Sequence, residues 1–233
     1  MPVRTVLFDL GGTLLVMERD SIFQKILEET GWMVSTDEVH AAYRNCDPWW
    51  LANYGSRTLG PEEYARALEM LDARVFLELF PSESPSEVLR VGKLATERWK
   101  ALEKDVPPTL FPDAKPLLGQ LKSGGYVLGL VSNASPDAAE IVDQVGLTDQ
   151  IDHVVISGAV GFSKPDPEIF RIALRMTGGR ADQTVHVGDL YEADVVGARN
   201  AGIRGILLDR DGVHGGADCP VVRNLSEVPG LLR

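Results

Sequence analysis

The chain has 233 residues, of which 44% are hydrophobic, and a formal net charge of −11. This length suffices for one domain with a large insertion or for two small domains. The acidic balance argues against a nucleic-acid partner, because phosphate backbones attract clustered Lys and Arg. A small phosphorylated ligand is still compatible with it, since one metal ion and one or two well-placed cations reverse the sign of the field inside a cleft.

The sequence contains no run of about 18 apolar residues, so we expect neither a membrane-spanning helix nor a membrane partner. The first residues, VRTVLFDL, lack the basic and apolar regions of a secretory signal, and a cytoplasmic protein is expected. Cys46 and Cys219 lie far apart in unlike contexts, which favours free thiols over a disulfide.

The first predicted element is a buried strand over residues 4–9, an aliphatic run that ends on Asp9 and breaks into Gly11 and Gly12. Helical spacing then dominates residues 16–105. Four helices are expected there, in SIFQKILEE, in STDEVHAAYRN, in GPEEYARALEMLDARVFLELF and from about Pro85 to Glu103. A Ser/Thr cap and an acidic first turn mark the start of the second helix, and a Pro marks the start of the third helix.

From about residue 105 onward, short apolar runs alternate with helical patterns. Strands are expected over 126–133, 153–158, 184–189 and 204–209, and helices over 113–123, 136–145, 166–177 and 192–201. This alternation is typical of a parallel sheet in an α/β fold, in which ligands bind beyond the carboxyl ends of the strands. We therefore predict a core of residues 1–15 and 106–233 with a helical cap, residues 16–105, inserted after the first strand.

Polar residues follow the predicted strands at the edge where a parallel sheet collects its carboxyl ends. They are Asp9, Ser132, Asn133, Lys164, Asp189 and Asp194. Carboxylate oxygens are ligands that Mg²⁺ prefers, and a hydroxyl and an ammonium group suit a phosphate. The sequence predicts one site for Mg²⁺ and a phosphate at this edge.

The segments FDLGGTL, LVSNAS, SKPDPEIF and GDLYEADVVGARNAGI resemble, in this order, the four motifs of the haloacid dehalogenase-like superfamily of phosphohydrolases. The resemblance spans nearly the whole chain. It implies a Rossmann-like core, an inserted helical cap and Mg²⁺-dependent hydrolysis of a small phosphorylated metabolite through an aspartyl-phosphate intermediate.

The resemblance also implies residue roles. Asp9 would be the nucleophile, and Lys164 would neutralise charge between Asp9 and the phosphoryl group. Ser132, the Asn133 backbone N–H and Thr13 would bind that group. Mg²⁺ would be held by Asp9, the backbone carbonyl of Gly11, Asp189 and Asp194, the last directly or through water.

The chain departs from the family pattern at Gly11. In phosphatases that resemble this protein, an acid at this position protonates the leaving group and then activates water. General acid–base catalysis is typically worth about 10²–10⁴-fold, so we expect a slower enzyme rather than an inactive one. Glu18 and Asp20, at the predicted entrance to the cap, are candidates to replace it.

Three alternatives stay open. Dehalogenases of the superfamily also lack the acid at the position of Gly11. They use no metal, however, and do not need the acids of GDLYEAD. Phosphonate-cleaving members require a cap lysine, and Lys25 is the only Lys between residues 16 and 92. A catalytically impaired binding protein is the third. The joint retention of four residues speaks against it, namely Asp9, Ser132, Lys164 and Asp189.

Substrate choice is expected to lie in the cap, where YRNCDPWWLANYGSR (43–57) is rich in aromatic and Arg residues. These side chains either line a pocket, with Arg44 and Arg57 binding substrate, or simply pack the cap. His186 lies inside a strand pattern and is interpreted as structural. A monomer or a homodimer is expected.

Overall fold

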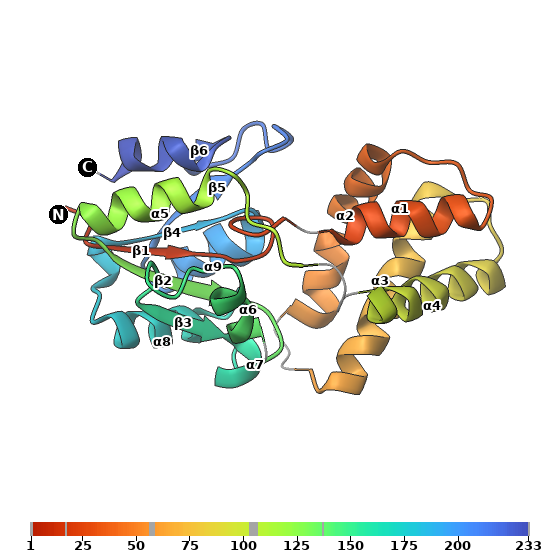
Figure 1. Ribbon diagram of the computed structural model, residues 1–233, viewed down its shortest axis with the longest axis horizontal. Coiled ribbons are helices and arrows are strands. Elements are labelled where there is room, and N and C mark those ends of the chain that lie inside the picture. The colour runs from red at the N-terminus through yellow and green to blue at the C-terminus, as the bar shows by residue number, and fades with distance from the viewer. Residues whose placement is uncertain (1, 17, 56–58, 103–106, 137, 233) are drawn as a thin grey trace. The chain divides into compact units, whose positions relative to one another are not determined.

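The computed structural model describes residues 2–16, 18–55, 59–102, 107–136 and 138–232 (Figure 1). The chain divides into two compact units. A core unit contains Met1–Val16 and Pro108–Arg233, and a helical unit contains Met17–Tyr54 and Leu59–Pro107. Among the described residues, no helix combines the length and the apolar character that crossing a membrane requires.

The core unit is built on a parallel sheet with the strand order β3-β2-β1-β4-β5-β6. Its strands are β1 (Thr5–Phe8), β2 (Val127–Ser132), β3 (His153–Ile156), β4 (Thr184–Gly188), β5 (Arg204–Leu208) and β6 (Val221–Val222). The predicted parallel α/β fold is confirmed. Because Phe8 of β1 is paired with Leu130 of β2 and with Val187 of β4, these three strands end side by side.

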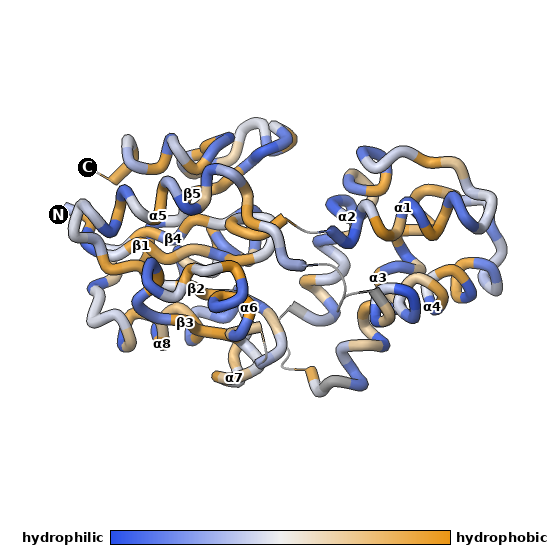
Figure 2. The backbone as a smooth tube through the Cα atoms, viewed as in Figure 1, coloured by the Kyte–Doolittle hydropathy of each residue, from blue (hydrophilic) through white to orange (hydrophobic). Residues whose placement is uncertain are grey.

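Helices cover both faces of the sheet. Val6 and Phe8 pack on one face against α5 (Ala114–Ser123) and the 3₁₀ helix η4 (Leu225–Leu231). Leu7 packs on the other face against α8 (Pro167–Thr177) and α9 (Gly197–Asn200). Burial on both sides explains the continuous apolar runs, whose hydrophobic colour follows β1 and β4 in Figure 2.

Several core elements differ from the sequence prediction. The expected helix over 192–201 is a π-helix, η3 (Tyr191–Val196), followed by the short α9. The expected strand over 153–158 ends at Ile156, and Ser157 begins the short helix α7 (Ser157–Val160). The strand β6 and the helix η4 were not predicted. The remaining elements are α6 (Ala138–Gln144) and the 3₁₀ turn η2 (Ala181–Gln183).

The helical unit contains the four expected helices. They are α1 (Arg19–Glu29), α2 (Thr36–Trp50), α3 (Pro61–Leu79) and α4 (Pro85–Leu102), with a π-helix η1 (Leu51–Gly55) after α2. Ser35 and Glu38 form a reciprocal capping box that begins α2. Phe23, Phe76 and Val91 belong to the separate hydrophobic core of this unit.

A buried carboxylate ties the helices of this unit together. Asp72 on α3 accepts hydrogen bonds from Arg19 on α1 (Nη2 to Oδ2, 2.6 Å), Tyr43 on α2 (2.7 Å) and Thr96 on α4 (3.0 Å). Because the network is satisfied on all sides, the cost of burying the ion pair is offset. Tyr43, one of the aromatic residues noted in 43–57, therefore serves packing within this unit.

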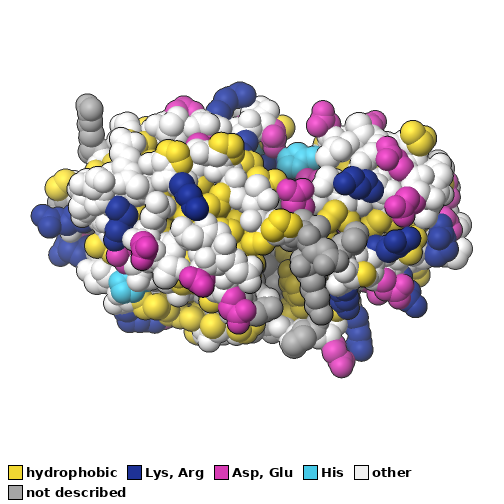
Figure 3. All heavy atoms as spheres, viewed as in Figure 1, with side chains coloured by type: hydrophobic (Ala, Val, Ile, Leu, Met, Phe, Trp, Pro, Cys, Tyr) yellow, Lys and Arg dark blue, Asp and Glu magenta, His cyan; other side chains and the backbone are white. Residues whose placement is uncertain are grey.

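The two core segments that flank the helical unit in the sequence, 14–16 and 109–111, are paired through their backbones. The backbone N–H of Val16 donates to Thr109 (2.8 Å), and that of Phe111 donates to Leu14 (2.9 Å). Arg210 adds a bond to the carbonyl of Thr13 (3.0 Å). On the face shown in Figure 3, basic and acidic side chains are interspersed over the surface of each unit.

Candidate active site

Asp9 follows β1 directly and is buried at the carboxyl edge of the sheet. Its backbone N–H donates to the carbonyl of Val187 on β4 (2.9 Å), which continues the strand pairing by one residue. The carboxylate is therefore carried on a rigid backbone rather than on a free loop. Such rigidity suits a nucleophile that must meet its target in one geometry.

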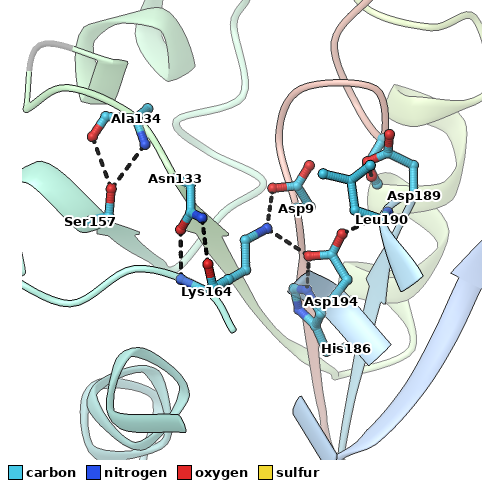
Figure 4. A network of polar contacts seen from close by, with 10 residues as sticks. Asp9, Asn133, Ala134, Ser157, Lys164, His186, Asp189, Leu190 and Asp194 are labelled. Carbon is cyan, nitrogen blue, oxygen red and sulfur yellow. Dashed lines mark hydrogen bonds and ion pairs between the residues drawn. The ribbon is translucent and has the colours of Figure 1, made fainter. Parts of the chain in front are cut away.

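Lys164 reaches this carboxylate from the loop between α7 and α8. Its buried ammonium group donates to Asp9 Oδ1 and to Asp194 Oδ1, the latter at 2.6 Å (Figure 4). One cation thus bridges two carboxylates that lie far apart in sequence. The site brings together the three motifs that contain these residues.

Asn133 holds the backbone of Lys164 through two hydrogen bonds. Its side-chain Nδ2 donates to the Lys164 carbonyl (2.8 Å), and the Lys164 N–H donates to Asn133 Oδ1 (2.7 Å). Ser157 supports the neighbouring residue in a similar way, since its hydroxyl bonds both the N–H and the carbonyl of Ala134 (3.1 and 3.2 Å). The sequence pointed only to the backbone of Asn133, so this role of its side chain was missed.

Three carboxylates converge beside the lysine. One oxygen each of Asp9, Asp189 and Asp194 lies within 4.8 Å of the other two. Thr13 Oγ1 donates to Asp189 Oδ1 at 3.3 Å. Gly12 has a φ of 76°, and a Cβ there would stand 2.4 Å from Asp189 Oδ2, so this position requires glycine.

Asp194 is fully enclosed within η3, where both carboxylate oxygens have partners. Oδ1 accepts from Lys164 and from Nε2 of His186 (2.9 Å), and Oδ2 accepts from the N–H of Leu190 (3.0 Å). The side chain is therefore fixed in one rotation.

Burial and the neighbouring charges separate the pKa values of these groups. Burial raises the pKa of Asp9, with Lys164 opposing and Asp194 adding to the rise. Burial also acts to raise the pKa of Asp194, but Lys164 and His186 outweigh it and hold that pKa below its ordinary value. The pKa of Lys164 is raised, since the two carboxylates overcome the effect of burial.

The donor set fits a divalent metal ion. Three buried carboxylates face one ammonium group, which leaves an excess of negative charge and hard oxygen donors in one place. A bound cation would also favour the ionised form of Asp9. Gly11, whose carbonyl was named as a further ligand, lies in the same loop two residues after Asp9.

The other candidate residues are placed as follows. Ser132 is buried at the end of β2 beside Asn133, and Thr13 is buried with its hydroxyl on Asp189. Arg44 lies on α2 of the helical unit, and Arg57 lies outside the described residues.

The proposed replacement acids also belong to the helical unit. Asp20 pairs with Nδ1 of His40, and Glu18 accepts from the hydroxyl of Ser21 (3.2 Å). Lys25, the only Lys noted between residues 16 and 92, is exposed on α1.

His186 is the site residue that sequence reasoning interpreted as structural only. It lies in the middle of β4 and bonds Asp194, which is eight residues away. A polar ring inside an otherwise apolar strand was the available signal. The partner was not predictable, because the contact depends on how η3 folds back over β4.

A protein-family model and several known proteins match this chain. A family model described as haloacid dehalogenase-like hydrolase matches residues 3–202. The haloacid dehalogenase-like hydrolase domain-containing protein 3 of Danio rerio is 31% identical over 244 residues, which cover 100% of this chain and 98% of that protein. A glyceraldehyde 3-phosphate phosphatase of Methanothermobacter thermautotrophicus is 37% identical over 131 residues, 52% of this chain and 58% of that enzyme.

Solved structures share the fold over the whole chain. The magnesium-bound HAD-hydrolase YfnB of Bacillus subtilis has a TM-score of 0.73 at 20% identity, with all of both chains covered. A 2-haloacid dehalogenase of Pseudomonas syringae has a TM-score of 0.58 at 23% identity, covering 99% of this chain and 98% of that one. Since this fold is shared by a dehalogenase, it does not by itself select a reaction.

Proposed function

Because the chain belongs to the haloacid dehalogenase-like hydrolases, we propose that it hydrolyses small phosphate monoesters with the aid of Mg²⁺ and through a phosphorylated Asp9. One observation carries the proposal: Lys164 bridges Asp9 and Asp194 in a buried site that Asp189 completes. The phosphatase named among the relatives supports the same reaction type.

In the first step, a carboxylate oxygen of Asp9 forms a bond to phosphorus as the bond from phosphorus to the leaving-group oxygen breaks. The leaving group departs with that electron pair, and Asp9 becomes an acyl phosphate. Lys164 stands at the attacking carboxylate and offsets negative charge that gathers there. Mg²⁺, held by Asp9, Asp189, Asp194 and the Gly11 carbonyl, would supply further charge neutralisation.

In the second step, water attacks phosphorus, inorganic phosphate leaves and the carboxylate of Asp9 is regenerated. The water must lose a proton, and in the first step the leaving group must gain one. Gly11 has no side chain for either transfer. We therefore expect good leaving groups, such as aryl, acyl or anomeric phosphates, to react best.

The remaining assignments are part of the same proposal. Ser132, the Asn133 N–H and Thr13 are expected to bind the phosphoryl group. Residues 16–105 are proposed as a cap that chooses the substrate, with Arg44 and Arg57 as candidates for binding its distal part. Single substitutions at these two arginines should raise KM and leave the metal dependence unchanged.

A substrate panel tests the proposal directly. Phosphomonoesters and 2-haloacids are each incubated with the enzyme in Mg²⁺ and in EDTA. We expect phosphate release in Mg²⁺ and none in EDTA. Halide release that EDTA does not affect, without turnover of any phosphomonoester, would replace the proposal by a dehalogenase reaction.

A further inference from the structure

His186 occupies a position where the fold needs only an apolar side chain. It lies in β4 between Val185 and Val187, is fully buried, and meets the ring of Phe170 edge-on at 5.0 Å between centroids. Burying a polar ring costs free energy unless the ring is hydrogen-bonded. An imidazole at this position therefore requires a reason beyond packing.

The imidazole ring of His186 forms a hydrogen bond with Asp194 of the active site. Nε2 must carry a proton, because the Asp194 oxygen 2.9 Å away belongs to a carboxylate that accepts. Among the described residues, Nδ1 of this ring has no hydrogen-bond partner. The polar character of His186 is thus directed at one atom, Oδ1 of Asp194.

That same oxygen receives Lys164. The backbone N–H of Leu190 donates to Oδ2 of Asp194, and the ring Nε2–H of His186, a short side chain on β4, donates to Oδ1. Lys164 reaches it on a long side chain with four rotatable bonds, which by itself would fix neither partner. A Cβ at Gly188 would stand 2.1 Å from Asp194 Cγ, so the space around the carboxylate is also closed.

We propose that His186 is a positioning residue: its Nε2–H holds Asp194 in the rotation that places the Lys164 ammonium group against Asp9. This inference rests on the proposed function for its catalytic consequence, but not for its structural content. Partners that orient a metal-binding or charge-bearing carboxylate typically contribute about 10–100-fold in metal affinity or activity. An effect of this size is expected here.

The test compares substitutions that keep or remove the donor. His186→Gln places an amide N–H near the position of Nε2, whereas His186→Phe fills the space without a donor. His186→Met is a second variant without a donor, in case the Phe variant does not fold. Val185→Ala is the matched control, since it weakens the same strand on its other face.

Crystal structures of the metal-free proteins give the first readout. We expect Asp194 to rotate and Lys164 to leave Asp9 in the Phe or Met variant, and both to stay in place in the Gln variant. Unchanged positions of Asp194 and Lys164 without a donor would overturn the proposal. This readout needs neither metal nor substrate, so it is decided even if phosphatase activity is absent.

Calorimetric Mg²⁺ binding and kinetics on an aryl phosphate give the second readout. We expect the Phe or Met variant to lose about 10–100-fold in Mg²⁺ affinity or kcat, and the Gln variant to stay within about threefold of the unmodified protein. Val185→Ala should lower the melting temperature without this loss. Equal losses in the Gln and Phe variants would show that a hydrogen-bond donor at this position does not preserve the site and would refute the donor role.

Discussion

Asp9 is held in the resting site by the ammonium group that would assist its reaction. Burial raises its pKa, whereas Lys164 favours its ionised form. Burial of the Asp9 carboxylate costs free energy. In return, the carboxylate is held in one orientation and is already paired with Lys164.

Replacing the nucleophile should abolish turnover. Asp9→Asn keeps the shape of the side chain but removes the charge that attacks phosphorus, and loss of a nucleophile typically costs more than about 10³-fold in kcat. Phosphate release from an aryl phosphate in Mg²⁺ measures the effect. Undiminished rates in a preparation free of contaminating phosphatase would exclude a covalent Asp9 intermediate.

Restoring an acid at position 11 should help poor leaving groups most. Among the described glycines of this loop, Gly12 has a positive φ and Gly11 does not, so the backbone conformation at position 11 is one that residues other than glycine also adopt. In Gly11→Asp, alkyl phosphates should gain up to about 10²–10⁴-fold while aryl phosphates gain little. The measurement is the dependence of kcat/KM on leaving-group pKa.

The matched control for this change is Gly11→Asn, which has a similar shape but no acidic proton. It should not reproduce the gain. If both variants behave alike, or if the unmodified protein already hydrolyses alkyl phosphates as fast as aryl ones, another residue supplies the proton. Glu18→Gln and Asp20→Asn would then be the substitutions to compare.

At the scale of elements, the sequence predicts best where local patterns and tertiary burial agree. β1, β2 and β4 are buried on both faces, so their apolar runs are unambiguous, and Ser35 with Glu38 marks the start of α2 by local hydrogen bonds. β6 has only two residues at the sheet edge, which is too short for any periodic signal.

The elements that shape the site were harder to predict. η3 is a π-helix whose wider turns place Asp194 over His186, and a period of 3.6 does not anticipate this. The bond from Asn133 to Lys164 joins residues 31 positions apart. The sequence therefore identified which residues gather at the sheet edge, but not which of them hold the others in place.

A carboxylate on α2 of the helical unit makes the stability of the protein depend on pH. Burial raises the pKa of Asp47 on α2 to about 6, with Arg44 opposing and Asp20 adding to the rise. The folded state thus binds the Asp47 proton more tightly than the unfolded chain does. The resulting contribution to stability is present at low pH and is lost as pH rises through about 6.

Asp47→Asn should therefore stabilise the protein at pH 8, by on the order of 1–2 kcal/mol, and bring no gain near pH 4. Urea unfolding at both pH values measures the difference. Asp37, exposed in the first turn of α2, is the control, because its charge complements the helix dipole and its removal should not stabilise. An equal gain for Asp47→Asn at both pH values would contradict this explanation.

At the scale of the whole molecule, the fold allows more than one reaction. The chain aligns over its full length with a hydrolase domain-containing protein, and its fold is shared by a magnesium-bound hydrolase and by a 2-haloacid dehalogenase. The choice between phosphate and halide chemistry therefore rests on a few side chains. Asp189 and Asp194, which with Asp9 form the acidic cluster, favour phosphate.

The central claim is that Asp9 becomes phosphorylated during turnover, and trapping that species tests it most directly. Because Gly11 offers no base to activate water, the acyl phosphate should persist when the leaving group is good. The enzyme is mixed with an aryl phosphate and Mg²⁺, quenched in acid within milliseconds to seconds, digested and analysed by mass spectrometry. We predict one added phosphoryl group on the peptide that contains Asp9, absent in EDTA and in Asp9→Asn, and much less abundant in Gly11→Asp. Steady turnover with no phosphoryl group on Asp9 at any quench time, or with the group on another residue, would contradict the account.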